Sequence, residues 1–249
     1  MHRQDPRTIA RIFGWLMVIT FVTSIPAKLI YDSILNEPGY MAGAGSDTSL
    51  LIAAFLEVLL IAANIGTAVV LFPLLRRQYE GTALGFVTAR IVESVFIAVG
   101  ILSVLAIVTL RQDPAGADTA SLSAVGASLV AIHDWTFLLG PGLTVGVGNG
   151  LLLGYLMYRT GLVPRRFAML GLIGGSLIIA TGIGVLFGAF EAGSAPQVIA
   201  TAPEFVWELG LGIYLIVKGF KPSPILEETS GSEGPVVIPS SVEAAKVDR

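Results

Sequence analysis

Long apolar runs separated by short polar stretches dominate the pattern of this 249-residue sequence. A transmembrane helix needs about 20 consecutive, mostly apolar residues, and several runs reach that length. The pattern predicts an all-α, polytopic membrane helix bundle that forms one transmembrane domain over residues 1–225. We expect six spans, over residues 9–31, 50–75, 83–110, 136–158, 167–190 and 202–220.

The boundaries of the later elements depend on local signals. The apolar stretch 122–158 is too long for one ordinary span, and Gly140-Pro141-Gly142 interrupts it. Because glycine and proline break helices, we expect a short interfacial helix over 119–135 before span four. Span six is expected to begin at Thr201-Ala202-Pro203-Glu204, a capping-box pattern with proline in the first turn. Residues 226–249 are rich in Ser, Gly, Pro and Glu, which predicts a disordered cytoplasmic tail.

Charge placement along the loops predicts the orientation of the spans. Basic residues fall at the ends of alternate loops, at Arg3, Arg7, Arg11, Arg76, Arg77, Arg159, Arg165, Arg166, Lys218 and Lys221. The intervening loops are mainly acidic, with Asp32, Glu37, Asp47, Asp113, Asp118 and Glu191 against Arg111. Since cytoplasmic loops carry the excess of lysine and arginine, we expect both termini in the cytoplasm.

Composition supports the same class of protein. Charged residues make up 13% of the chain, against roughly a quarter in soluble domains. Glycine recurs at every fourth position in span four (Gly142, Gly146, Gly150 and Gly154) and as the pairs Gly171/Gly175 and Gly184/Gly188 in span five. Small residues at this spacing favour close helix packing, and the same stripes offer a route to oligomerisation. The absence of cysteine excludes disulfides and thiolate sites, and the dispersed basic residues give no case for nucleic acid.

Charged and amide side chains inside the apolar runs are the candidate functional residues. Ionisable groups at membrane depth are costly, so they face a protein interior, pair, or line a pathway. From a rise of about 1.5 Å per residue, five of them fall roughly 10–15 Å from the cytoplasmic edge: Asn64, Arg90, Glu93, Asn149 and Glu208. Glu57 lies about 22 Å from that edge. Spans two, three, four and six are therefore expected to share a polar layer.

A structural interpretation of the same residues stays open. Arg90 and Glu93 are three residues apart on one helix face, so they can neutralise each other locally. Asn64 and Asn149 can serve as hydrogen-bond partners between helices. Under this interpretation the buried polar groups fix helix packing and bind no ligand.

His133-Asp134-Trp135 marks a second candidate site on the outer side. Three interpretations are open: an interfacial anchor with Trp135 in the aromatic belt, a proton-handling histidine, and a metal ligand. Adjacent residues on a helix do not face each other, so Asp134 is badly placed to orient His133. Ligand spacing for a metal is missing, and we expect neither a metal nor a cofactor.

Several short motifs together resemble a known family. They are Glu57 to Asn64, Arg90-Ile-Val-Glu93, Ile132-His-Asp-Trp135, Gly154-Tyr-Leu-Met-Tyr-Arg159, Leu162-Val-Pro-Arg165 and Trp207-Glu208. Over roughly residues 7–221 the chain resembles an uncharacterised bacterial membrane family, domain of unknown function 4386. The resemblance implies several transmembrane helices in the inner (plasma) membrane of a bacterium, and it carries over no activity, cofactor or catalytic residue.

Three hypotheses for the function follow, in order of preference. The first is an integral membrane protein that binds or moves a small molecule or ion through the polar layer. The second is an intramembrane enzyme on a lipid-like substrate that uses His133, Asp134, Glu57 and Glu208 for acid–base chemistry. The third is an accessory subunit whose buried ion pairs are purely structural.

Overall fold

The computed structural model describes residues 5–35, 40, 45–114, 116 and 118–230. Over these residues the chain is helical and contains no strand, which confirms the predicted all-α class. Five helical segments are long and apolar enough to cross a membrane: Pro6–Leu35, Asp47–Gln112, Thr119–Thr160, Arg165–Leu186 and Ala195–Val217.

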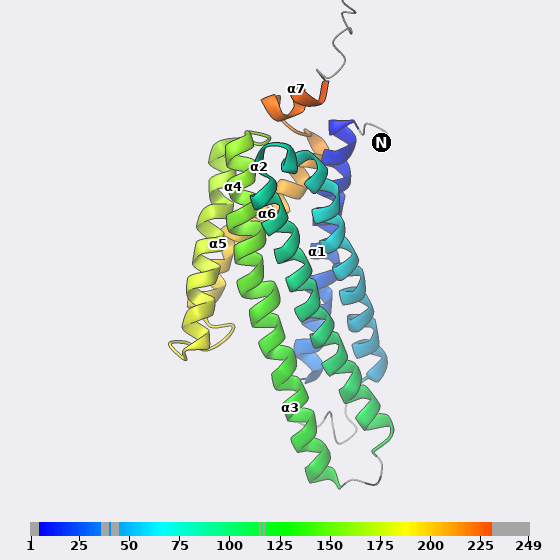
Figure 1. Cartoon of the computed structure of the whole chain (residues 1–249). Coiled ribbons are helices and arrows are strands. Elements are labelled where there is room, and N and C mark those ends of the chain that lie inside the picture. Colours follow the sequence, from blue (N-terminus) through cyan, green and yellow to red (C-terminus); the bar gives the residue numbers. More distant parts are fainter. Residues whose placement is uncertain (1–4, 36–39, 41–44, 115, 117, 231–249) are drawn as a thin grey trace, which may run out of the picture.

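The hairpin predicted between residues 50 and 110 is built from one helical segment with a sharp bend. Helix α2 (Asp47–Gln112) has non-helical backbone angles at Tyr79, inside the polar stretch that separates the two apolar runs. The two halves lie side by side and antiparallel (Figure 1), and at the open end the Asp47 carboxylate accepts a hydrogen bond from Arg111 at 2.8 Å. Helix α1 (Pro6–Leu35) packs along this hairpin.

The predicted break at Gly140-Pro141-Gly142 is wrong. Helix α3 (Thr119–Phe137) continues into π-helix η2 (Leu138–Thr144), π-helix η3 (Gly146–Leu153) and helix α4 (Gly154–Thr160) as one rod. Proline lacks an N–H and its ring crowds the preceding turn of an α-helix. The wider π turns, which hydrogen-bond residue i to i+5, accommodate Pro141 without ending the helix.

The last two membrane-length helices are α5 (Arg165–Leu186) and α6 (Ala195–Val217). The predicted start of span six at Thr201 is wrong, because α6 begins six residues earlier with Pro196 in its first turn and Pro203 in its interior. Ser194-Ala195-Pro196 carries nearly the same start signal as residues 201–203, and the chain uses the earlier copy.

A short helix, α7 (Pro224–Ser230), closes the described chain. It corrects the predicted disordered tail at residues 226–230, where the structure is helical. The remainder of that tail, residues 231–249, lies outside the described residues.

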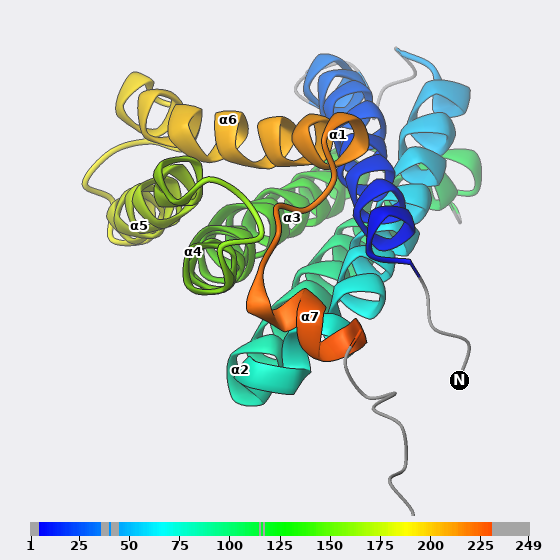
Figure 2. The ribbon, with the colours of Figure 1, turned by 90° about the horizontal axis from the view of Figure 1, so that it is seen from above.

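Close glycine contacts hold α6 against α1 and the rod against α5. Seen from above, α6 crosses from α5 to α1 (Figure 2). A Cβ on Gly14 of α1 would lie 2.6 Å from the Gly212 carbonyl oxygen of α6. A Cβ on Gly150 of the rod would lie 2.3 Å from the Gly175 Cα of α5. The predicted close packing of spans four and five therefore occurs within the chain, while oligomerisation through these stripes stays a prediction.

Candidate functional site

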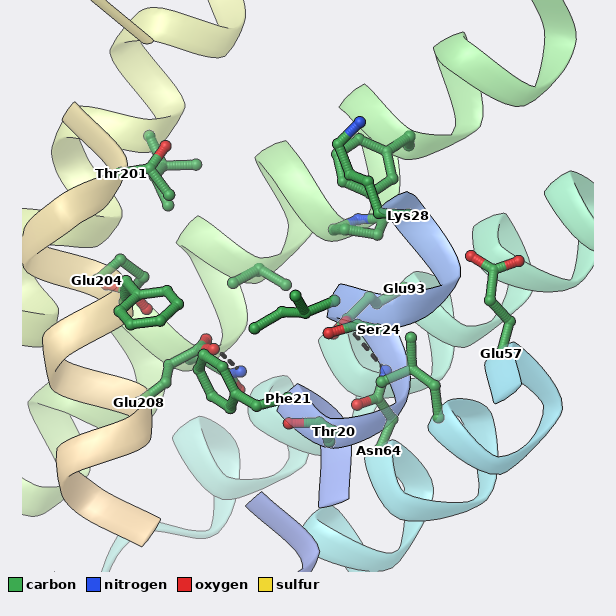
Figure 3. Close-up of a pocket in the computed structure, with 18 of the residues that line it drawn as sticks. Thr20, Phe21, Ser24, Lys28, Glu57, Asn64, Glu93, Thr201, Glu204 and Glu208 are labelled. Carbon is green, nitrogen blue, oxygen red and sulfur yellow. Dashed lines mark hydrogen bonds between the residues drawn. The ribbon is translucent and has the colours of Figure 1, made fainter. Parts of the chain in front are cut away.

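A cavity of about 240 Å³ lies inside the bundle, between α1, the two halves of α2, the rod, α5 and α6. Its polar lining comes from Thr20, Ser24, Lys28, Glu57, Asn64, Arg90, Glu93, Asn149, Thr201, Glu204 and Glu208. Figure 3 shows Glu204 and Glu208 of α6 on one side of this space and Asn64 of α2 on another. The six residues that the sequence assigned to a polar interior all line this one cavity.

The cavity reaches the surface of the bundle between α1 and α6. These helices meet where Phe21 packs edge-on against Phe205, with ring centroids 5.1 Å apart. Beyond that contact the lining includes Ile25 and Lys28 of α1 and Thr201 of α6, which are all exposed.

Asn64, Arg90 and Glu93 form a closed ring of hydrogen bonds at the inner wall. Arg90 donates through Nη1 to Glu93 Oε2 at 2.6 Å and through Nη2 to Asn64 Oδ1. Asn64 in turn donates through Nδ2 to Glu93 Oε1 at 2.9 Å. All three side chains are buried, at 0–4% exposure. The ring joins the two halves of α2 and neutralises the arginine with one carboxylate.

A second polar contact joins the rod to α6. Asn149 donates through Nδ2 to Glu208 Oε1 at 2.6 Å, and Trp207 donates through its indole N–H to the Asn149 carbonyl oxygen at 2.9 Å. Trp207 is fully buried. These bonds fix the height of α6 against the π-helical part of the rod, and they leave Asn149 Oδ1 buried without a hydrogen-bond partner.

Glu204 stands out among the lining residues and was missed by the sequence interpretation. Its side chain is 1% exposed, and neither carboxylate oxygen has a hydrogen-bond partner among the described residues. Gly150 and Gly174 make room for it, since a Cβ on either would lie 3.0 or 2.6 Å from Glu204 Oε2. The available signal was its spacing from Glu208, because residues i and i+4 share one helix face.

Glu57 belongs to a separate group at the far side of the cavity. Tyr31 of α1 donates its hydroxyl to Glu57 Oε2 at 3.0 Å, and its ring packs edge-on against His133 with centroids 4.7 Å apart. Tyr31 was not among the predicted residues, because a tyrosine near the end of an apolar run gives no distinct signal. The structure therefore places Glu57 beside His133 and away from Glu208 (Figure 3).

The predicted outer group His133-Asp134-Trp135 does not assemble into one site. His133 is buried, whereas the Asp134 side chain is 70% exposed and Trp135 is 47% exposed. His133 Nδ1 lies 3.6 Å from Asp134 Oδ1, which is too long for a hydrogen bond. The side chains of His133 and Asp134 thus point in different directions, because adjacent residues on a helix do not face each other.

The described side chains offer no cluster of metal ligands. Within the described part of the chain, no group of three or more His, Asp or Glu residues is placed to hold a metal ion. The acid–base set of the enzyme hypothesis is also divided, since Glu208 bonds to Asn149 while His133 packs on Tyr31.

Comparison with known proteins identifies the family without a function. Neither a curated protein nor a solved structure matches the chain. A family model described as "Domain of unknown function (DUF4386)" matches residues 12–219, which include every residue that lines the cavity. The chain therefore belongs to the DUF4386 family, as its motifs suggested.

Proposed function

We propose that this chain is a six-spanning protein of a bacterial inner membrane that binds a small molecule or ion in its cavity and moves it. Six spans result if each half of α2 crosses the bilayer once, and the bend at Tyr79 supports that division. The bend, α7 and the described N-terminal end lie at one end of the molecule (Figure 1). Arg76 and Arg77 lie at this end, which supports a cytoplasmic location for both termini.

The orientation has a direct test, because the chain contains no cysteine. We expect a single cysteine at Glu80, in the bend of α2, to react with a membrane-impermeant maleimide only after the cells are opened. A single cysteine at Ala120, near the start of α3, is expected to react in intact spheroplasts. Both positions are exposed, so labelling in the reverse pattern would contradict the proposed topology.

The observation that carries the binding proposal is Glu204 in the cavity wall. A buried polar group without a partner costs free energy, and an ionisable one at membrane depth costs more. A helix bundle that needs only packing would be more stable with an apolar side chain there. A ligand that donates a hydrogen bond to the Glu204 carboxylate would explain why a glutamate is buried at this position.

The purely structural hypothesis explains part of the same region. The Asn64–Arg90–Glu93 ring is satisfied by its own members and joins the halves of α2, so it needs no ligand. Glu204 has no such counterpart, and the cavity volume beside it is not needed for packing. Binding and structural roles therefore fall on different residues of one polar layer.

Filling the cavity tests binding. Val145 is buried and lines the cavity, so Val145→Phe occupies part of its volume. Val95→Phe is the matched control, because Val95 is 55% exposed on the lipid-facing side of α2. The full chain is purified from its native membrane, and small molecules extracted from it are compared by mass spectrometry.

We expect a small molecule that co-purifies with the native chain and the Val95→Phe variant and is depleted from Val145→Phe. Equal amounts in all three proteins would show that the molecule binds elsewhere. A Val145→Phe variant that retains the native melting temperature but changes nothing else would contradict a functional cavity.

A further inference from the structure

Carboxyl groups outnumber cationic side chains in the lining of the cavity. Its two positively charged side chains are already engaged: Arg90 bonds through both terminal nitrogens within the ring, and Lys28 Nζ lies 2.9 Å from both carboxylate oxygens of Asp32. Against these two cations stand four carboxylates, those of Glu57, Glu93, Glu204 and Glu208. The lining therefore holds more carboxyl groups than cationic side chains.

The atoms that lack a partner have the same bias. Three buried acceptor atoms in the lining are unsatisfied: Glu204 Oε1, Glu204 Oε2 and Asn149 Oδ1. Arg90 Nε is the one unsatisfied donor among the described lining residues. Both acceptor-bearing side chains come from the helices that Trp207 holds together, so they lie on one wall. A ligand that satisfies them must donate hydrogen bonds.

The rest of the lining is apolar and aromatic. Phe21 and Phe205 stand at the opening between α1 and α6, and Leu60, Val145 and Ile178 line the interior. A bare inorganic cation needs more oxygen ligands than three acceptors provide, since Ca²⁺ takes six to eight. An apolar body suits these walls, and aromatic faces also attract cationic groups.

The volume limits the size of the ligand. Pockets for drug-sized molecules enclose about 300–1,000 Å³, and this cavity, at about 240 Å³, lies below that range. The opening beside Phe21 and Phe205 is bordered by aromatic side chains, which suit the passage of a ligand with an apolar body.

We propose that the cavity binds a small organic cation, a protonated amine with a short apolar body, whose N–H groups donate to Glu204 and Asn149 and whose body lies against Phe21 and Phe205. The proposal rests on the proposed function, because it names the ligand class of the same cavity. It assigns Glu204 as the main specificity residue. Glu208 adds a second carboxyl group one turn along the same helix, while its Oε1 stays bonded to Asn149.

The test compares three series of ligands on the native full chain in detergent micelles. Primary amines from propylamine to hexylamine are matched by chain length with the corresponding alcohols and carboxylates. A ligand that binds only the folded state raises the thermal unfolding midpoint, and at equal concentration the tighter ligand raises it more, because the stabilisation grows with the logarithm of concentration over Kd. We expect amines to raise it more than the alcohol of equal length, and carboxylates to leave it unchanged.

Substitution at Glu204 then locates the binding. Glu204→Gln keeps the size of the side chain and removes its charge, and we expect it to weaken amine binding roughly ten- to hundred-fold, the usual range for losing a charged hydrogen bond. Glu80→Gln is the matched control, because Glu80 is exposed in the bend of α2 and far from the cavity lining. Its amine affinity is expected to equal that of the native chain.

Three results would overturn the proposal. Alcohols that stabilise the chain as well as amines would show that Glu204 acts as a neutral hydrogen-bonding group. If carboxylates bind best, the cavity prefers anionic ligands and the proposed preference for cations is wrong. If no compound binds while Val145→Phe still depletes the co-purified molecule, the ligand class is wrong and the proposed function stands. The comparison of the three series uses the native chain, so it does not depend on any variant folding.

Discussion

The Asn64–Arg90–Glu93 ring makes a quantitative prediction about stability. The perturbation is a double-mutant cycle with Arg90→Met and Glu93→Met, which removes each charge alone and then both together. Arg90 and Glu93 are 2% and 4% exposed, and the Nη1–Oε2 distance is 2.6 Å. Either single variant leaves the other charge buried without its ion-pair partner, with Asn64 as its remaining hydrogen-bond partner in the ring.

The expected magnitudes follow from that burial. Removing one partner of a buried ion pair costs about 3–5 kcal/mol, because the remaining charge has no counterion. Replacing both partners by apolar side chains of similar volume is often nearly neutral. We therefore expect each single variant to lose about 3 kcal/mol or more of unfolding free energy. The double variant should lose less than either single one, which gives an interaction free energy of at least about 3 kcal/mol.

The assay is reversible unfolding of the full chain in mixed micelles, followed by far-UV circular dichroism. The control cycle uses Lys28→Met and Asp32→Met, an i,i+4 pair whose side chains are 45% and 50% exposed. An exposed pair of this kind is worth about 0–1 kcal/mol. Losses at Arg90 and Glu93 that simply add, as in the control cycle, would refute a mutually neutralised buried pair.

Two further predictions concern helix packing and helix capping. Gly150→Ala should destabilise the chain by about 1–3 kcal/mol in the same unfolding assay, because its Cβ would lie 2.3 Å from Gly175 Cα. Gly81→Ala is the control, and it should be neutral or stabilising because a Cβ at Gly81 meets nothing within 4 Å. Equal losses of stability in the two variants would contradict the close packing at Gly150. The pKa of Asp118 is lowered because the backbone N–H and the hydroxyl of Ser121 donate to its carboxylate. Its contribution to stability is therefore complete above the unfolded pKa of about 3.9 and is lost as the pH falls through the folded pKa. Asp118→Asn should remove that part of the pH dependence of the unfolding midpoint, and an unchanged profile would contradict the cap.

Much of the polar layer could be predicted from the sequence, because helix geometry converts residue number into depth. Counting 1.5 Å per residue placed Asn64, Arg90 and Glu93 at similar heights on two helices. A hairpin brings similar heights together, and the structure joins the three side chains directly. The same count placed Asn149 and Glu208 in one layer, and they too are hydrogen-bonded.

The sequence predictions were wrong where one local sequence pattern is compatible with two structures. Residues 201–204 have the pattern of a helix start, so Glu204 was interpreted as a capping residue, although a similar signal at Ser194 starts α6. Gly140-Pro141-Gly142 has the pattern of a break, although π turns carry the helix through it. Choosing between these structures requires the packing of α6 against the rod, which depends on contacts far apart in sequence.

The proposed ligand bonds to the Glu204 carboxylate, which has no hydrogen-bond partner among the described residues. The most direct measurement is an experimental structure of the native chain, extracted from its membrane into lipid nanodiscs with hexylamine added. We expect non-protein density within hydrogen-bond distance of Glu204, between Phe21 of α1 and Asn149 of the rod. A Glu204 carboxylate that bonds to another side chain of the protein, with the cavity closed around it, would show that no ligand binds there.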